Sequence, residues 1–188
     1  LQYDLVMLLN VAIILGSVSI LWLVSIPLRD VSIIDMVFAL ILLGVTYCSY
    51  QLGDGEVARK NIILALVTIW SVRITWHLVR RNWGHGEDAR YSKLRSWVDN
   101  DRTFIWLSLR KVFLLQGVVL WLVSLPVQIA LIFESPLQLG WIAYIGAIIC
   151  GSGIVIETIS DAQLTRFRAD PSGAVSYTHL TLPTIYSV

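Results

Sequence analysis

The chain has 188 residues, of which 56% are hydrophobic and 14% are charged, and its mean hydropathy is +0.72. Soluble domains carry about 25% charged residues, so this composition excludes an ordinary soluble globule, a disordered tail and a nucleic-acid-binding arm. The formal net charge of +1 indicates no strongly acidic partner. The remaining class is a protein that spends most of its length in lipid.

Long apolar segments set the predicted fold. A helix needs about 20 apolar residues to cross roughly 30 Å of hydrocarbon. Four segments of about this length carry no charged side chain, and a fifth carries only Arg73. We therefore predict an all-α fold, a polytopic transmembrane helical bundle with five spanning helices. These helices are expected over residues 4–27, 31–52, 61–81, 111–133 and 137–159.

The distribution of lysine and arginine predicts the orientation. Cytoplasmic loops of membrane proteins carry an excess of these residues. The side that holds the first loop, the third loop and the segment after the fifth helix has nearly all of them, whereas the other side has only Arg59 and Lys60. We therefore expect the loop at 81–110 to be cytoplasmic. The basic residues on that side are Arg29, Arg80, Arg81, Arg90, Lys93, Arg95, Arg102, Arg110, Lys111, Arg166 and Arg168.

The two ends of the chain differ from the rest. The first residue is Leu1, and residues 175–188 read VSYTHLTLPTIYSV. This stretch resembles a translated sequencing adapter, and the alternative is a genuine short tail with strand-like alternation. We expect residues 1–173 to form one C-terminally truncated transmembrane domain, residues 175–188 to be no part of it, and the natural parent to have about seven spanning helices.

Two groups of polar residues lie within or beside the predicted spans. Arg73 lies near the middle of the third helix, with His77 one turn later on the same face. Ionisable groups at membrane depth are costly and usually face a cavity or a partner, so this stripe indicates an anionic ligand. The alternative, snorkelling to lipid headgroups, explains Arg80 and Arg81 well. Asp35 is interpreted as an acid in the first turn of a helix, near the interface, and the alternative is a substrate-binding group.

The end of the fifth helix carries a second polar face. Helical spacing places Glu157, Asp161 and Arg168 on that face. An arginine there can bind a phosphate with two hydrogen bonds, and the carboxylates can accept from ribose or amide donors. The alternative is an amphipathic helix leaving the bilayer with ordinary interfacial charges. Arg95 and Arg102, in the third loop, are expected to be solvated or to contact headgroups.

The sequence S-D-A-Q-L-T-R-F-R at 160–168 resembles the steroid 5-alpha-reductase superfamily, in which a helix carries S-D-x-x-L-x-x-x-R. Four other fragments, in the same order and spacing, are similar to a bacterial branch of uncharacterised membrane proteins with this reductase-like domain. They are R-D-V-S-I-I-D at 29–35, W-S-V-R-I-T-W-H-L-V-R-R at 70–81, G-E-D-A-R-Y-S-K-L-R at 86–95 and L-L-Q-G-V-V-L-W-L-V-S-L-P at 114–126.

The resemblance implies a cofactor site and a membrane. In that family the aspartate and the final arginine of the motif contact NADPH, so Asp161 and Arg168 are the expected cofactor ligands, joined by Glu157, Arg73 and Arg81. The expected location is a bacterial inner membrane. The catalytic residues stay unassigned, because the family's C-terminal signature is absent and Trp70 stands where steroid reductases have a tyrosine. No metal site is expected.

Three functions follow from this resemblance and from the composition. The first is an NADPH-dependent membrane oxidoreductase that, as the full-length parent, reduces an activated carbon–carbon double bond of an apolar, steroid- or isoprenoid-like substrate; the truncated chain itself is expected to be inactive. The second is an S-adenosylmethionine-dependent methyltransferase of the related isoprenylcysteine methyltransferase type. The third is a membrane protein without enzymatic activity. Membrane lipids and an apolar small molecule are the expected partners, and the sequence does not indicate the oligomeric state.

Overall fold

The computed structural model describes residues 2–84, 86–134 and 138–169. Helices and turns make up these residues, so the predicted all-α fold is confirmed. The predicted tail at 175–188 and the last residues of the predicted domain at 1–173 lie outside the described part. The helices are α1 (Gln2–Leu28), α2 (Ile33–Leu52), α3 (Val57–Asn82), α4 (Ala89–Arg95), α5 (Asp101–Ser108), the π-helical turn η1 (Leu109–Phe113), α6 (Leu114–Ile132) and α7 (Trp141–Ala169).

Five helical segments are long and apolar enough to cross a membrane, in agreement with the five predicted spans. The fourth begins at Asp101 instead of near residue 111, because α5, η1 and α6 follow one another without a break. Asn100 starts this segment, since its side chain accepts a 2.7 Å hydrogen bond from the Thr103 amide. Part of the predicted loop at 81–110 is therefore helical. The fifth helix, α7, continues to Ala169, beyond the predicted end at 159.

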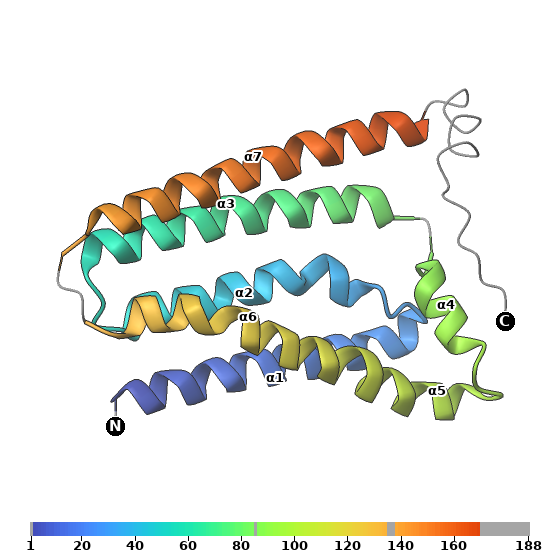
Figure 1. Ribbon diagram of the computed structural model, residues 1–188. Helices are drawn as coiled ribbons and strands as arrows, with labels where there is room; N and C mark the ends of the chain where they lie inside the picture. Colours follow the sequence, from blue (N-terminus) through green and yellow to red (C-terminus); the bar gives the residue numbers. More distant parts are fainter. Residues whose placement is uncertain (1, 85, 135–137, 170–188) are drawn as a thin grey trace, which may run out of the picture. The chain divides into compact units, whose positions relative to one another are not determined.

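Residues Leu1–Ala147 form one compact unit built around α2. This helix packs against α1, α3 and α6, and α1 also packs against α6. Figure 1 shows these four long helices side by side, with the short α4 and α5 at the end where α1 finishes and α2 begins. The loop between α3 and α6 therefore lies beside the loop between α1 and α2. This proximity positions the polar residues described below.

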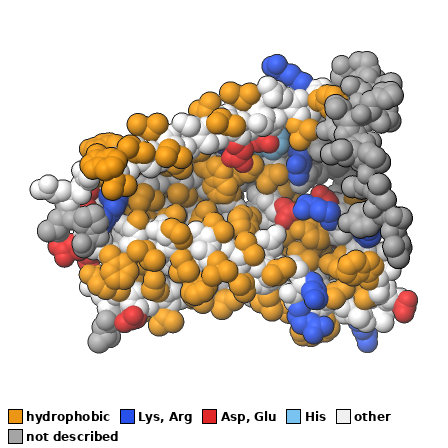
Figure 2. All heavy atoms as spheres, in the orientation of Figure 1, with side chains coloured by type: hydrophobic (Ala, Val, Ile, Leu, Met, Phe, Trp, Pro, Cys, Tyr) orange, Lys and Arg blue, Asp and Glu red, His pale blue; other side chains and the backbone are white. Residues whose placement is uncertain are grey.

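The interior of this unit is apolar, and so is most of its outer surface. Phe113, Ile34 and Val45 are fully buried in the core. Leu8 and Ile20, in contrast, are 66% and 62% exposed on α1, a candidate spanning helix. Figure 2 shows hydrophobic side chains over much of the visible face, whereas charged side chains gather toward the ends of the helices. Such a surface is stable in a bilayer, where apolar side chains meet lipid tails.

At the other end of the unit, the loop between α2 and α3 closes tightly over the end of α6. The Asp54 amide donates to the Ile132 carbonyl at 3.1 Å, and the Gly55 amide donates to the Leu131 carbonyl at 3.1 Å. These bonds satisfy carbonyls that the last helical turn leaves free. A Cβ atom at Gly53 or Gly55 would lie 2.4 or 2.5 Å from the Leu131 oxygen. Glycine is therefore required here by the close approach of two backbones.

The second unit, Ile148–Val188, is described as the C-terminal part of α7. The helix is continuous through this part, up to Ala169. It carries Glu157, Asp161 and Arg168, three of the predicted cofactor ligands.

Candidate functional site

An ion pair in the third loop holds that loop against the start of α2. Arg95, the last residue of α4, donates from Nε and Nη2 to the two carboxylate oxygens of Glu87, at 3.0 and 2.9 Å. The same carboxylate accepts the Val31 amide at 3.1 Å. Arg95 also donates to the Arg29 carbonyl at 3.3 Å, and its guanidinium lies 3.9 Å from the centre of the Phe104 ring.

These contacts correct one expectation. Arg95 was expected to be solvated or to contact headgroups, but its side chain is only 29% exposed, and its partner Glu87 is 10% exposed. Arg95 is partly buried by tertiary contacts with the Phe104 ring and with the loop between α1 and α2, which the local sequence around Arg95 does not indicate. Arg102 is exposed, in agreement with the expectation.

A second cluster joins α4 to the first turn of α2. The Tyr91 hydroxyl donates to both carboxylate oxygens of Asp35, at 3.0 and 3.2 Å, and Arg90 donates to the same carboxylate at 2.9 Å. Asp88 caps α4 by accepting the Arg90 amide at 2.9 Å and also accepts from its side chain at 3.0 Å. Asp35 thus lies in the first turn of its helix, as interpreted from the sequence, with partners from the third loop.

Two pKa values in this cluster are displaced. Burial, followed by the neighbouring Asp35 carboxylate, raises the pKa of the Tyr91 hydroxyl well above its usual range. The side-chain hydrogen bond from Arg90, followed by the backbone hydrogen bond from its amide, lowers the pKa of the Asp88 carboxyl. Tyr91 therefore stays protonated and Asp88 stays ionised near neutral pH. The cluster attaches the third loop to the start of α2, and its carboxylates and guanidinium bind one another.

The predicted ligands on α3 lie along its second half. Arg73 and His77 are half-buried, one turn apart. Arg80 and Arg81 are exposed in the last turn, and Arg81 Nε donates to the side-chain oxygen of Asn82 at 3.0 Å. Eight residues separate Arg73 from Arg81, about 12 Å along the helix axis and close to one face. Guanidinium groups therefore occur along the second half of α3, from Arg73 to its last turn.

The predicted ligands on α7 are spaced along the end of that helix. Glu157 and Asp161, one turn apart, are half-buried, and Arg168 follows two turns later. The helical backbone runs without interruption through all three positions, which places them close to one face. Arg168 comes directly after the candidate span Trp141–Phe167. The structure thus brings these three residues onto one helix, whereas Arg73 and Arg81 belong to α3 in the first unit.

A buried polar network inside the bundle was not predicted from the sequence. Asn10 of α1 donates from Nδ2 to Ser49 Oγ of α2 and to Gln128 Oε1 of α6, both at 2.8 Å. Gln128 in turn donates to Ser124 Oγ at 2.7 Å. All four residues are 0% exposed. An asparagine and a glutamine in charge-free spans were the available signal, because amide side chains in a bilayer require partners on neighbouring helices.

Five long apolar helices around a buried core, with charged loops at their ends, define an α-helical polytopic membrane protein. Within that class, a protein-family model described as "Protein of unknown function (DUF1295)" matches residues 21–180. The chain belongs to this family. No curated protein and no solved structure matches the chain.

Proposed function

We propose that this protein is an NADPH-dependent membrane oxidoreductase, similar to the steroid 5-alpha-reductase superfamily, that reduces an activated double bond of an apolar substrate. The family match over residues 21–180 includes every fragment that carries the resemblance, from 29–35 to 160–168. The proposed cofactor ligands are Glu157, Asp161 and Arg168 on α7, with Arg73 and Arg81 on α3.

The observation that carries this proposal is the uninterrupted course of α7 beyond its apolar part. Because the helix continues to Ala169, Asp161 and Arg168 are seven residues apart near one face, about 10 Å along the axis. This spacing along one helix matches the reach of one extended dinucleotide.

The chemistry of the ligand set fits NADPH. Guanidinium groups bind phosphate with paired hydrogen bonds, and carboxylates accept from ribose hydroxyl or amide donors. When bound, the cofactor supplies a hydride, and the protein supplies binding, orientation and electrostatics.

A methyltransferase of the isoprenylcysteine type is the second candidate, with S-adenosylmethionine in place of NADPH. This ligand carries a sulfonium cation and no phosphate. Three arginines in the ligand set therefore favour NADPH on electrostatic grounds. The basic loop at 81–110 is proposed to be cytoplasmic, where soluble dinucleotides are available.

The test is cofactor binding by the purified protein in lipid nanodiscs, measured by calorimetry with NADPH and with S-adenosylmethionine. Arg168→Ala should weaken NADPH binding at least about tenfold, the lower end for a lost charge-assisted hydrogen bond. Arg168→Lys should restore part of the affinity, because a lysine cannot form the paired bonds. Arg166→Ala is the matched control, since this exposed arginine lies two residues earlier on the same helix and toward a different face.

Each outcome decides between the candidates. Unchanged NADPH affinity in a folded Arg168→Ala protein would show that the arginine is an ordinary interfacial charge. Binding of S-adenosylmethionine, lost in the same variant, would replace the reductase by a methyltransferase. Binding of neither molecule would favour a membrane protein without this enzymatic activity.

A further inference from the structure

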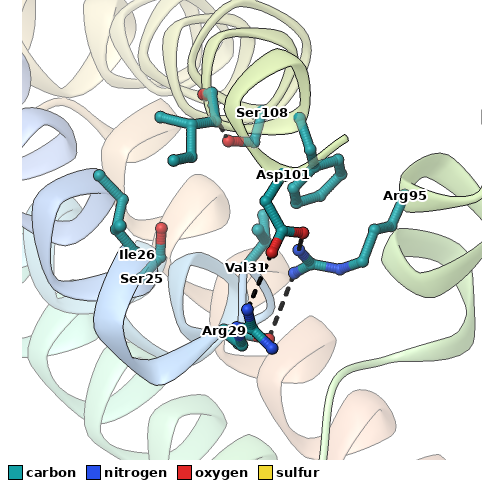
Figure 3. A pocket seen from close by; sticks show the side chains of 9 residues that line it. Ser25, Ile26, Arg29, Val31, Arg95, Asp101 and Ser108 are labelled. Atoms are coloured by element: carbon teal, nitrogen blue, oxygen red, sulfur yellow. Dashed lines mark hydrogen bonds and ion pairs between the residues drawn. The ribbon is translucent and has the colours of Figure 1, made fainter. Parts of the chain in front are cut away.

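A small cavity lies between the end of α1, the loop that follows it and the start of α5. Its volume is about 220 Å³. Ile26, Val31, Phe104 and Ile105 form its apolar walls. Figure 3 shows Arg29, Arg95 and Asp101 grouped at one side of this space, with Ser25 and Ile26 facing them from α1. The cavity thus has apolar walls and, at one side, charged groups of both signs.

The two opposite charges at the cavity form an exposed ion pair. Arg29 Nη2 lies 2.8 Å from Asp101 Oδ2, and the two side chains are 77% and 61% exposed. Exposed ion pairs contribute little net stability, because water screens them and ordering two long side chains costs entropy. A ligand that offers one anionic and one cationic group can therefore replace this contact at little cost.

The backbone of Arg29 is fixed in an unusual conformation. Its φ is 51°, in the left-handed region that non-glycine residues rarely occupy. Contacts on both sides hold it there, because the Asp30 amide donates to the Ser25 carbonyl at 3.3 Å and Arg95 donates to the Arg29 carbonyl at 3.3 Å. This is the Schellman C-cap of α1, because the Arg29 amide also donates to the Ile26 carbonyl at 3.3 Å.

The cavity lies where two candidate membrane spans end. The span of α1 finishes at Leu28, and the fourth span begins at Asp101. Beside the cavity, Trp22 donates from its ring nitrogen to the Ile105 carbonyl at 3.1 Å, and the Trp22 and Trp106 rings are 5.9 Å apart. Trp106 is 62% exposed. Tryptophans at the end of a span are typical of the headgroup level of a bilayer.

We propose that this cavity binds the headgroup of a zwitterionic phospholipid that carries a primary ammonium, such as phosphatidylethanolamine. The Arg29 guanidinium would bind the phosphate, the Asp101 carboxylate would bind the ammonium, and the apolar walls would cover the adjoining methylene groups. The second arginine, Arg95, is neutralised by Glu87, holds the Arg29 carbonyl, and lies 3.9 Å from the Asp101 carboxylate, which it orients toward the cavity. The site is therefore charge-balanced, which favours a zwitterion over an anionic headgroup that would approach the Asp101 carboxylate.

Native mass spectrometry of the detergent-purified protein tests this site, because it counts bound lipids and yields their dissociation constants. The probes are dihexanoyl phosphatidylethanolamine, phosphatidylcholine and phosphatidylglycerol, together with free O-phosphoethanolamine. We expect phosphatidylethanolamine to bind about fivefold tighter than each of the other lipids, the factor that corresponds to about 1 kcal/mol for an exposed ion pair. Free O-phosphoethanolamine should bind more weakly than the lipid, because it lacks apolar groups.

Two variants separate binding from folding. Arg29→Gly removes the guanidinium and relieves the left-handed backbone, so the protein should fold at least as well and lose the preference for phosphatidylethanolamine. Asp101→Asn should shift the preference toward phosphatidylglycerol, because the site then carries excess positive charge. Arg102→Ala, an exposed neighbour outside the cavity lining, is the matched control and should leave the lipid preference unchanged.

The proposal is overturned by an unchanged lipid preference in Arg29→Gly, or by equal binding of the three lipids to the unmodified protein. Binding of free O-phosphoethanolamine as tight as that of the lipid would also overturn it, because the site would then serve a soluble ligand.

Discussion

Glu87 and Arg95 form a two-point ion pair that also anchors the third loop to the loop between α1 and α2. One Glu87 oxygen binds the Arg95 guanidinium at 2.9 Å and the Val31 amide at 3.1 Å. This arrangement connects two segments more than fifty residues apart in the chain. The pair therefore stabilises the end of the bundle at which the cavity beside Arg29 is located.

The first prediction concerns this pair. Arg95→Ala should lower the free energy of unfolding by about 2 kcal/mol, because it leaves the Glu87 carboxylate partly buried without its cation. Reversible unfolding in mixed detergent micelles measures the change. Arg102→Ala is the control, and we expect a change within about 0.5 kcal/mol. Equal effects of the two substitutions would show that Arg95 is merely a solvated charge.

The second prediction concerns the close approach of the loop between α2 and α3 to α6. Gly55→Ala should destabilise the protein by about 2 kcal/mol, since its Cβ would lie 2.5 Å from the Leu131 carbonyl oxygen and force the backbones apart. Gly16→Ala, on α1, is the matched control. A Cβ there meets nothing within 4 Å, so thermal unfolding should show unchanged or slightly increased stability.

The third prediction concerns the buried amide network. Asn10→Leu and Gln128→Leu should each destabilise the bundle, because the first leaves Gln128 without its interhelical partner and the second removes one of the two interhelical partners of Asn10. In a double-mutant cycle the coupling energy should be about 1 kcal/mol, within the range for interhelical hydrogen bonds in membranes. Strictly additive effects would mean that the 2.8 Å contact contributes no net stability.

The fourth prediction is a pH dependence at the start of α4. The pKa of Asp88 is lowered in the folded protein, chiefly by the hydrogen bond from the Arg90 side chain. Its contribution to stability is therefore complete above the unfolded pKa of about 4 and is lost as the pH falls through the lower folded value. The melting temperature of Asp88→Asn should fall less steeply below about pH 4.5 than that of the unmodified protein. Parallel curves would contradict this assignment.

The fifth prediction concerns orientation. Ser96 is exposed at the end of α4, so a cysteine there should react with a membrane-impermeant thiol reagent if its side of the membrane is accessible. In intact cells we expect no labelling at Ser96→Cys and labelling at Val57→Cys, which is 68% exposed at the start of α3. Permeabilised cells should label both. The reverse pattern would place the loop at 81–110 outside.

Hydropathy alone predicted much of the fold. The five spans follow from the length of charge-free segments, because a single helix in lipid satisfies its own backbone and needs no distant partner to form. The ends of the helices were less accurate. α7 continues to Ala169 because alanine, glutamine, leucine and arginine residues after its apolar part favour helix, and Asn100 starts the fourth span early through a local side-chain cap.

Part of the candidate site was also predictable from the sequence, and part was not. The sequence by itself placed Glu157, Asp161 and Arg168 near one face, because helical spacing is local. It did not reveal that Arg95 binds Glu87 and the Arg29 carbonyl, or that Arg29 and Asp101 meet at a cavity. Those contacts depend on how two loops come together when α2 packs against α1 and α6. Only the tertiary structure decided them, because the charge and exposure of a loop residue depend on neighbours that hydropathy does not specify.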